Sequence, residues 1–138
     1  FQKECINLLD ALLDESYEVM LETGGSLPIK NVPEKVIKIV DFKCPSSGME
    51  KKNLWSIINY LQVHDEIKFV IGDRKDFEWS KYIIDKYSLN TICTIFFSPV
   101  YDKLKPALLV DWILKDNINV RMQLQIHKNI WPADKKGV

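Results

Sequence analysis

The sequence lacks an excess of either charge. It has 19 Lys and Arg against 19 Asp and Glu in 138 residues, which gives a formal net charge of zero. A nucleic-acid-binding domain usually carries a basic surface, so this protein could bind nucleic acid only through a local basic patch. No apolar run approaches the roughly 20 residues that cross a bilayer, and the first residues do not resemble a signal peptide. We therefore expect neither a nucleic-acid partner nor a membrane partner.

Cysteine and glycine are also scarce. The three cysteines, Cys5, Cys44 and Cys93, lie far apart, in a spacing that fits neither a disulfide framework nor a zinc or iron–sulfur motif. We expect a reduced, cytoplasmic protein. The five glycines form neither a P-loop nor a dinucleotide-binding fingerprint.

The composition is that of a globular domain, with 46% hydrophobic and 28% charged residues. At this length we expect one domain that spans residues 1–138. Because the chain starts with Phe1 inside an expected helix, we also expect it to be part of a longer polypeptide.

Hydrophobic periodicity predicts alternating strands and helices. Pro28 and Pro33 leave little room for a helix between the first two strands, and Pro106 suits the first position of a helix. Strands are expected at residues 17–22, 35–42, 66–71, 91–97 and 119–126. Helices are expected at residues 4–14, 52–61, 75–87 and 106–115, followed by a polar tail at 127–138. Successive strands lie far enough apart for β-α-β crossovers, and no Asn-Gly or Asp-Gly turn joins two of them. The sequence predicts an α/β fold with a parallel sheet.

In such a fold, ligands bind where the strands end, because loops and helix N-termini converge there. Polar and glycine residues follow all five expected strands, at residues 22–26, 41–48, 72–73, 98–101 and 125–127. The first segment suits a ribose hydroxyl or an amino-acid head group as well as it suits a plain turn. In the second, Lys43 and two serine hydroxyls could bind a carboxylate, and a Pro-Ser turn is an equally good explanation. Cys44 is better explained as a packing residue than as a nucleophile. Gln125 and His127 should leave the same strand face, although a structural role for His127 is favoured.

Three segments resemble one enzyme family. They are Leu-Glu-Thr-Gly-Gly at residues 21–25, Asp-Phe-Lys-Cys-Pro-Ser-Ser-Gly at 41–48, and Gln-Leu-Gln-Ile-His-Lys-Asn-Ile-Trp at 123–131 with the ending Lys-Gly-Val. In order and interval they resemble the C-terminal part of the 7-carboxy-7-deazaguanine synthases, radical S-adenosylmethionine enzymes of queuosine biosynthesis. The resemblance implies the C-terminal portion of a partial, open β/α barrel, a cytoplasmic location and a homodimer.

The resemblance also implies a lyase reaction and its cofactors. The family contracts the ring of 6-carboxy-5,6,7,8-tetrahydropterin to 7-carboxy-7-deazaguanine. A reduced [4Fe–4S] cluster cleaves S-adenosylmethionine to a 5′-deoxyadenosyl radical, and Mg²⁺ organises the substrate. The implied contacts to S-adenosylmethionine are Glu22, Thr23, Asp41, Phe42, Lys43, Ser98, Pro99 and Val100. The implied contacts to substrate are Gln125, His127 and the terminal carboxylate of Val138.

The sequence departs from the family in its cofactor motifs. It has no C-x3-C-x2-C cluster motif, no glycine-glycine-glutamate motif and no metal-binding threonine. The resemblance therefore assigns no catalytic or metal-ligating residue to these 138 residues, which we expect to be inactive alone. Two other functions stay open: a non-catalytic binding or interaction module, and a radical activating enzyme that acts on a protein partner.

Overall fold

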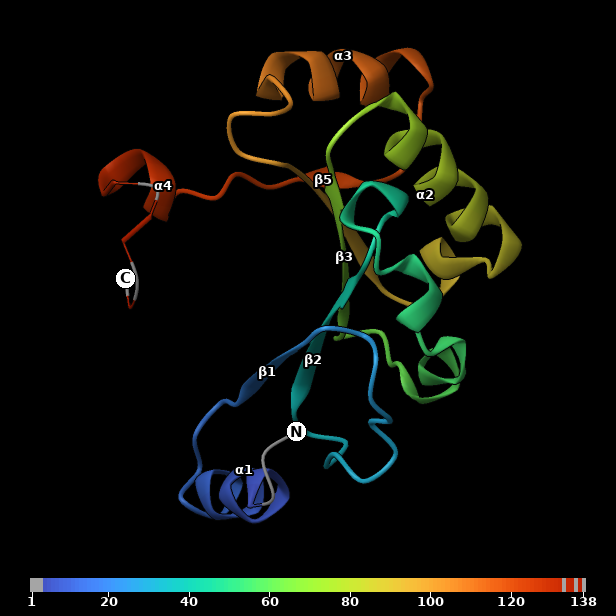
Figure 1. Cartoon of the computed structure of the whole chain (residues 1–138). Coiled ribbons are helices and arrows are strands. Elements are labelled where there is room, and N and C mark those ends of the chain that lie inside the picture. The colour runs from blue at the N-terminus through green and yellow to red at the C-terminus, as the bar shows by residue number, and fades with distance from the viewer. Residues whose placement is uncertain (1–3, 133, 136, 138) are drawn as a thin grey trace.

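A computed structural model describes residues 4–132, 134, 135 and 137. Five strands form one sheet in the order β1-β2-β3-β4-β5, and every neighbouring pair is parallel. The strands are β1 (Met20–Thr23), β2 (Ile37–Phe42), β3 (Glu66–Ile71), β4 (Thr94–Pro99) and β5 (Arg121–Met122). The predicted parallel α/β fold is confirmed (Figure 1).

The strands alternate with helices and short 3₁₀ segments. The α-helices are α1 (Cys5–Asp14), α2 (Arg74–Lys86), α3 (Pro106–Lys115) and α4 (His127–Ile130). The 3₁₀ segments are η1 (Pro45–Ser47), η2 (Glu50–Lys52), η3 (Trp55–Tyr60) and η4 (Leu89–Thr91). Pro106 begins α3 as expected, and the segment with Pro28 and Pro33 contains no helix. None of the helices in the described ranges is long and apolar enough to span a membrane.

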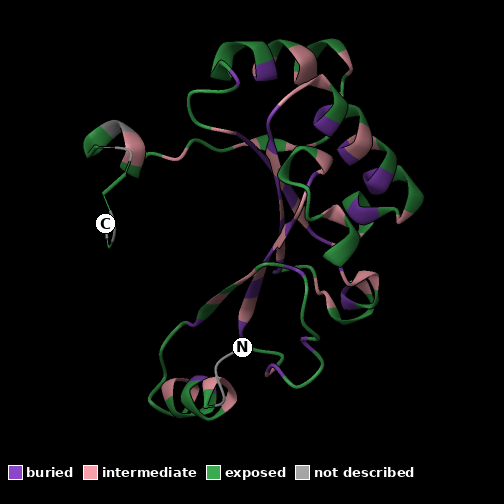
Figure 2. Ribbon diagram, viewed as in Figure 1, coloured by how far each residue is buried: buried purple, intermediate pink, exposed green. Residues whose placement is uncertain are grey.

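One face of the sheet carries the core. On β2, β3 and β4, every second side chain points to this face and is buried. Phe42, Phe69 and Phe97 are among these residues and are completely buried. Their rings contact Trp55 of η3 and Phe77 of α2. Figure 1 shows η3, α2 and α3 on this side, and Figure 2 shows the buried residues along the strands and the inward surface of α2.

The opposite face of the sheet is largely open. Apart from the buried Ser98, its side chains on β1 to β4 are exposed or half-buried, and the strand register aligns several of them in rows across the strands. One row joins Asp41 of β2, Lys68 of β3 and Phe96 of β4. The next row, nearer the carboxyl edge, joins Val70 to Ser98. Polar groups at this edge therefore border an accessible surface, as a binding site requires.

Two predicted elements are wrong. Residues 52–61 do not form one α-helix, because Asn53 and Leu54 are extended and separate η2 from η3. Both residues make tertiary hydrogen bonds instead: the Asn53 side chain bonds the backbone of Lys43, and the Leu54 N–H donates to the Gly25 carbonyl at 2.8 Å. The helix-like spacing of the apolar residues therefore reflects side chains that are buried against the sheet, and not one continuous helix.

The expected strand at 119–126 pairs only over Arg121–Met122, beside Phe96 and Phe97. After one further bond, from the Gln123 N–H to the Phe97 carbonyl at 2.9 Å, the chain leaves the sheet. Figure 1 shows it extending to α4, away from the side that carries α2 and α3. His127 begins α4, so the expectation that Gln125 and His127 share one strand face is wrong.

Candidate functional site

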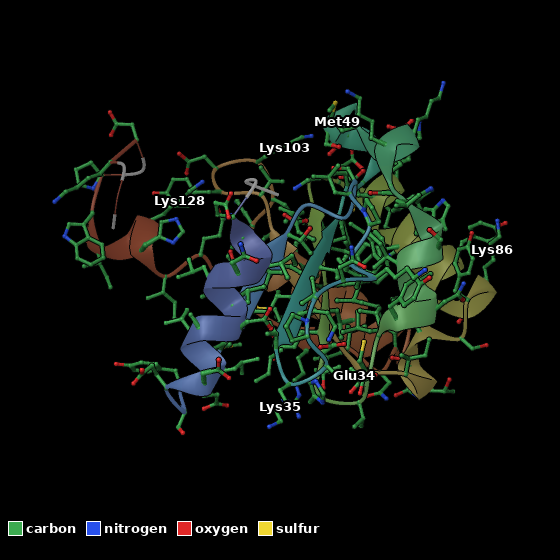
Figure 3. All side chains as sticks on the ribbon, turned by 90° about the horizontal axis from the view of Figure 1, so that it is seen from below. Glu34, Lys35, Met49, Lys86, Lys103 and Lys128 are labelled. Atoms are coloured by element: carbon green, nitrogen blue, oxygen red, sulfur yellow. The ribbon has the colours of Figure 1, made fainter. Side chains whose placement is uncertain are left out.

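Most of the predicted site residues lie where the parallel strands end. Glu22 and Thr23 close β1, Asp41 and Phe42 close β2, and Ser98 and Pro99 close β4. Lys43 and Val100 follow directly. Because the strands are parallel and adjacent, these residues meet at one carboxyl edge. In Figure 3, Lys103 and Met49, which lie on loops that follow strands, mark one margin, while Glu34 and Lys35, which precede β2, mark the opposite margin.

Three hollows follow one another along this edge, and we call them together the carboxyl-edge trough. The first, of about 260 Å³, lies between β1, β2 and β3 and is lined by Glu22, Asp41, Lys43 and Lys68. The second, of about 420 Å³, shares Asp41 and Lys43 with the first and reaches Lys103. The third, of about 500 Å³, shares Lys103 and ends at Gln125. The shared residues make the hollows continuous, so the trough could hold an extended ligand.

Unpartnered polar atoms point to a ligand in this region. In the part of the chain that the structure describes, three buried side-chain atoms have no hydrogen-bond partner: Asp41 Oδ1, Ser98 Oγ and Gln125 Oε1. Leaving a buried polar atom without a partner costs about 1–3 kcal/mol, so such atoms are rare in folded proteins. All three belong to residues that the sequence predicted for this site. A ligand with hydroxyl or N–H donors would satisfy the two acceptor-only atoms.

Lys43 and Asp41, which line the first two hollows, form an ion pair. Lys43 Nζ lies 2.7 Å from Asp41 Oδ2, and both side chains are about one-third exposed. The backbone of Lys43 is held by Asn53, whose Oδ1 accepts from the Lys43 N–H at 2.9 Å and whose Nδ2 donates to the Lys43 carbonyl at 2.9 Å. Asn53 is buried, and its two hydrogen bonds fix the backbone from which the Lys43 side chain extends into the trough.

A buried carboxylate joins two loops of the trough. Asp76, in the first turn of α2, is fully buried and accepts hydrogen bonds from the Ser46 N–H, the Ser46 hydroxyl and the Gly72 N–H. Its own N–H donates to the side chain of Asp73, which caps α2. A larger residue at Gly72 would displace these side chains, because an added Cβ would lie 2.7 Å from Ser46 Oγ and 2.8 Å from Lys103 Nζ.

Three predicted residues are not placed as expected or not placed at all. The ring of Phe42 belongs to the core, where it contacts Trp55, so only its backbone borders the trough. His127 is exposed on α4 and lines none of the three hollows. Val138 lies outside the described residues. Of the expected substrate contacts, the structure brings only Gln125 to the trough.

Sequence reasoning did not single out Lys68 and Lys103, which line the trough, or Asn53 and Asp76, which hold its loops in place. Lys68 had a visible signal, because it is a cation in the middle of a strand and lies between the core residues Ile67 and Phe69. Asn53 and Asp76 had none, because their partners are distant in sequence.

The buried thiols of Cys44 and Cys93 do not fit ligands of an iron–sulfur cluster. Burial raises the pKa of Cys44 to about 12, and the pKa of Cys93 also to about 12, whereas a cluster ligand must be a thiolate. Cys44 packs as expected, with its sulfur 3.5 Å from Ser80 Oγ. Nor do the described His, Cys, Asp and Glu side chains form a group of three that could hold a metal ion.

Similar proteins carry one shared name. No model of a protein family matches the chain. Curated 7-carboxy-7-deazaguanine synthases do match: that of Koribacter versatilis is 37% identical over 150 residues, and that of Chlorobaculum tepidum is 40% identical over 141 residues. The Clostridium acetobutylicum synthase is 36% identical over 142 residues.

These alignments include 98–99% of this chain but 62–66% of the relatives, so the chain spans just under two thirds of their length. The similarity therefore extends over almost the whole of this chain. By this similarity, together with its parallel sheet, the chain belongs to the 7-carboxy-7-deazaguanine synthase family.

Proposed function

We propose that this chain is the C-terminal portion of a radical S-adenosylmethionine lyase that converts 6-carboxy-5,6,7,8-tetrahydropterin to 7-carboxy-7-deazaguanine. The family relationship supports the reaction. The observation in the structure that carries the proposal is the set of unpartnered atoms on Asp41, Ser98 and Gln125, which follow three different strands at one edge. An open parallel sheet with a free face suits a partial barrel.

The trough matches the functional groups of S-adenosylmethionine. Asp41 Oδ1 can accept from a ribose hydroxyl, and Lys43 can bind the carboxylate of the methionine part. Ser98, Pro99 and Val100 can border the adenine, where the unpartnered Ser98 hydroxyl is free to donate or accept. Glu22 and Thr23 lie beside Lys43 in the first hollow and offer acceptors to the ammonium group.

The remaining parts of the enzyme are proposed to come from outside this chain. The [4Fe–4S] cluster, when bound, supplies the electron that cleaves S-adenosylmethionine. The residues described here bind and orient the cofactor and exclude water from it. Mg²⁺ would organise the substrate through ligands elsewhere in the protein. We also propose the homodimer that is typical of the family.

Turnover by the full-length protein tests the reaction. The protein that contains this chain, purified without oxygen and reconstituted with iron and sulfide, should convert the carboxylated pterin to 7-carboxy-7-deazaguanine with release of ammonia, as followed by mass spectrometry. Cleavage of S-adenosylmethionine without any pterin product would instead favour an activating enzyme. Absence of cofactor binding would favour a non-catalytic module.

Asp41→Asn tests the cofactor site. This variant keeps the size of the side chain but loses the charge that pairs with Lys43 and weakens the acceptor for the ribose. We expect the Kd of S-adenosylmethionine to rise about 10-fold, the loss of roughly one charge-assisted hydrogen bond. Titration calorimetry measures it. Asp10→Asn, an exposed change on α1, is the matched control and should leave the Kd unchanged. Equal affinities for the two variants would contradict the placement of the ribose at Asp41.

A further inference from the structure

Lys68 is a half-buried cation on the open face of the sheet. It lies in the middle of β3, where its neighbours Ile67 and Phe69 point into the core and are fully buried. Its side chain therefore points to the other face, and it lines the first hollow of the trough with Glu22 and Asp41. Burying part of a lysine in a strand costs free energy unless an anion compensates its charge.

The described residues give Lys68 no such anion. Asp41 is its direct cross-strand neighbour on β2, yet that carboxylate pairs with Lys43. Among the residues that the structure describes, Lys68 takes part in no ion pair and its side chain in no hydrogen bond. The first hollow thus contains one cation that is paired with a carboxylate, Lys43, and one that has no ion pair among the described residues, Lys68.

The residues around Lys68 limit the kind of ligand that it could bind. Its row is one step deeper on the open face than the row of Ser98, whereas Lys43 stands at the rim after β2 ends. On its other side, the register places Phe96, whose half-buried ring contacts none of the other described aromatic rings. A cation that shares a row with an aromatic ring suits a flat ring that carries a carboxylate. The amino-acid end of S-adenosylmethionine has no such ring next to its carboxylate.

We infer that Lys68 binds the carboxylate of the pterin substrate and so selects the carboxylated pterin over pterins that lack this group. The inference rests on the proposed function for the identity of the substrate. The ammonium of Lys68 donates to the carboxylate, and the pterin ring lies toward Phe96. Charge-assisted hydrogen bonds of this kind are stronger than neutral ones and would be effective in the half-buried trough.

The test compares two ligands in the full-length protein and its Lys68→Met variant. Methionine keeps the length and apolar contacts of the lysine stem and removes the charge. We expect the KM and Kd of 6-carboxytetrahydropterin to rise about 30-fold, the loss of one hydrogen bond to a charged group. The Kd of tetrahydropterin without the carboxyl group, and that of S-adenosylmethionine, should change less than about twofold.

Two further variants complete the design. Lys68→Arg keeps the positive charge and should recover most of the affinity for the carboxylated pterin. Lys75→Met removes an exposed lysine on α2 and should leave both pterins unaffected. A loss that is equal for the two pterins would mean that Lys68 only supports the fold. A loss confined to S-adenosylmethionine would assign Lys68 to the cofactor carboxylate. Either result, or unchanged affinities, overturns the inference.

The two proposals can fail separately. If the unmodified protein binds the carboxylated pterin but makes no deazaguanine, the proposed reaction is wrong, while the binding comparison still decides the role of Lys68. If turnover is normal and Lys68→Met changes the affinity for neither pterin or for both equally, the proposed reaction is supported and the assignment of Lys68 is wrong.

Discussion

At the scale of residues, a single buried amide fixes the backbone beside the site. Asn53 is 8% exposed, and it bonds both the N–H and the carbonyl of Lys43. It thereby acts in place of a backbone partner where the chain leaves β2. Its own backbone, being extended, also ends η2. One side chain therefore determines both the position of Lys43 and the failure of residues 52–61 to form an α-helix.

Asn53→Ala should destabilise the protein by about 3 kcal/mol, because two buried peptide groups lose their partners at about 1–3 kcal/mol each. The free energy of unfolding from urea denaturation measures the effect. Asn90→Ala, at an exposed position of η4, serves as the control and should change stability by less than about 0.5 kcal/mol. A similar small effect for Asn53→Ala would show that water replaces the amide without loss.

The residues that could be predicted from the sequence are those whose position follows from the strand ends. Asp41, Ser98 and Gln125 were identified because they end or follow expected strands. The structure leaves a polar atom of each unpartnered, and Asp41 and Gln125 line the trough. Asn53 could not be identified, since nothing in the sequence relates it to Lys43. Phe42 was assigned to the site by resemblance, but strand alternation directs its ring into the core.

At the scale of elements, α2 and α3 are joined by charged side chains. Asp116, which follows α3, lies 2.5 Å from Lys81 Nζ and 3.1 Å from Arg74, and both cations are on α2. The Arg74 guanidinium also lies over the rings of Phe77 and Trp112, at 4.6 and 5.2 Å from their centroids. The hydrogen bond from Lys81 lowers the pKa of Asp116 below its usual 3.8.

This ion pair makes part of the stability depend on pH. Because the pKa of Asp116 is lower in the folded state than in the unfolded state, its contribution is present above pH 3.8 and is lost as the pH falls through the folded pKa. Asp116→Asn should lower the Tm at pH 7, and the difference from the unmodified protein should shrink in acid. Tm is measured across this pH range by circular dichroism. Asp85→Asn, at an exposed position of α2, should show no such trend. A difference that is constant with pH would exclude the charge as the cause.

Helices and strands could be predicted where the hydrophobic pattern within one segment is enough to decide their type and length. The long central strands β2 and β3, and the helices α1, α2 and α3, appear within a few residues of their predicted bounds. Residues 119–126 had the composition of a strand, but β5 pairs along only Arg121–Met122. Ladder length at a sheet edge depends on the neighbouring strand, which periodicity within one segment does not report.

At the scale of the whole molecule, the cysteines are separate from the proposed cofactor chemistry. Cys44 and Cys93 are buried, and burial keeps their pKa near 12, so that both are protonated thiols at neutral pH. Cys5 is half-buried on α1. The resemblance expects the cluster to be held by a motif that these 138 residues do not contain.

Replacing all three cysteines, as Cys5→Ser, Cys44→Ala and Cys93→Ala, should leave the iron and sulfide content of the reconstituted full-length protein unchanged. Chemical analysis of iron and sulfide measures this, and circular dichroism verifies that the variant is folded. A folded variant that has lost iron would place a cluster ligand within this chain and contradict the assignment.

The strictly sequential order of the strands has a consequence for biosynthesis. Each strand pairs only with the strands just before and just after it in the chain, and no later segment inserts between two earlier ones. A nascent chain that leaves the ribosome can therefore add β2 to β1, then β3 to β2, without waiting for its end to be translated. The short β5 ladder and the segment with Gln125 join last. The binding edge is thus completed only after the segment with Gln125 has joined, so a chain that stops before this segment presents no finished pocket to the proposed cofactor.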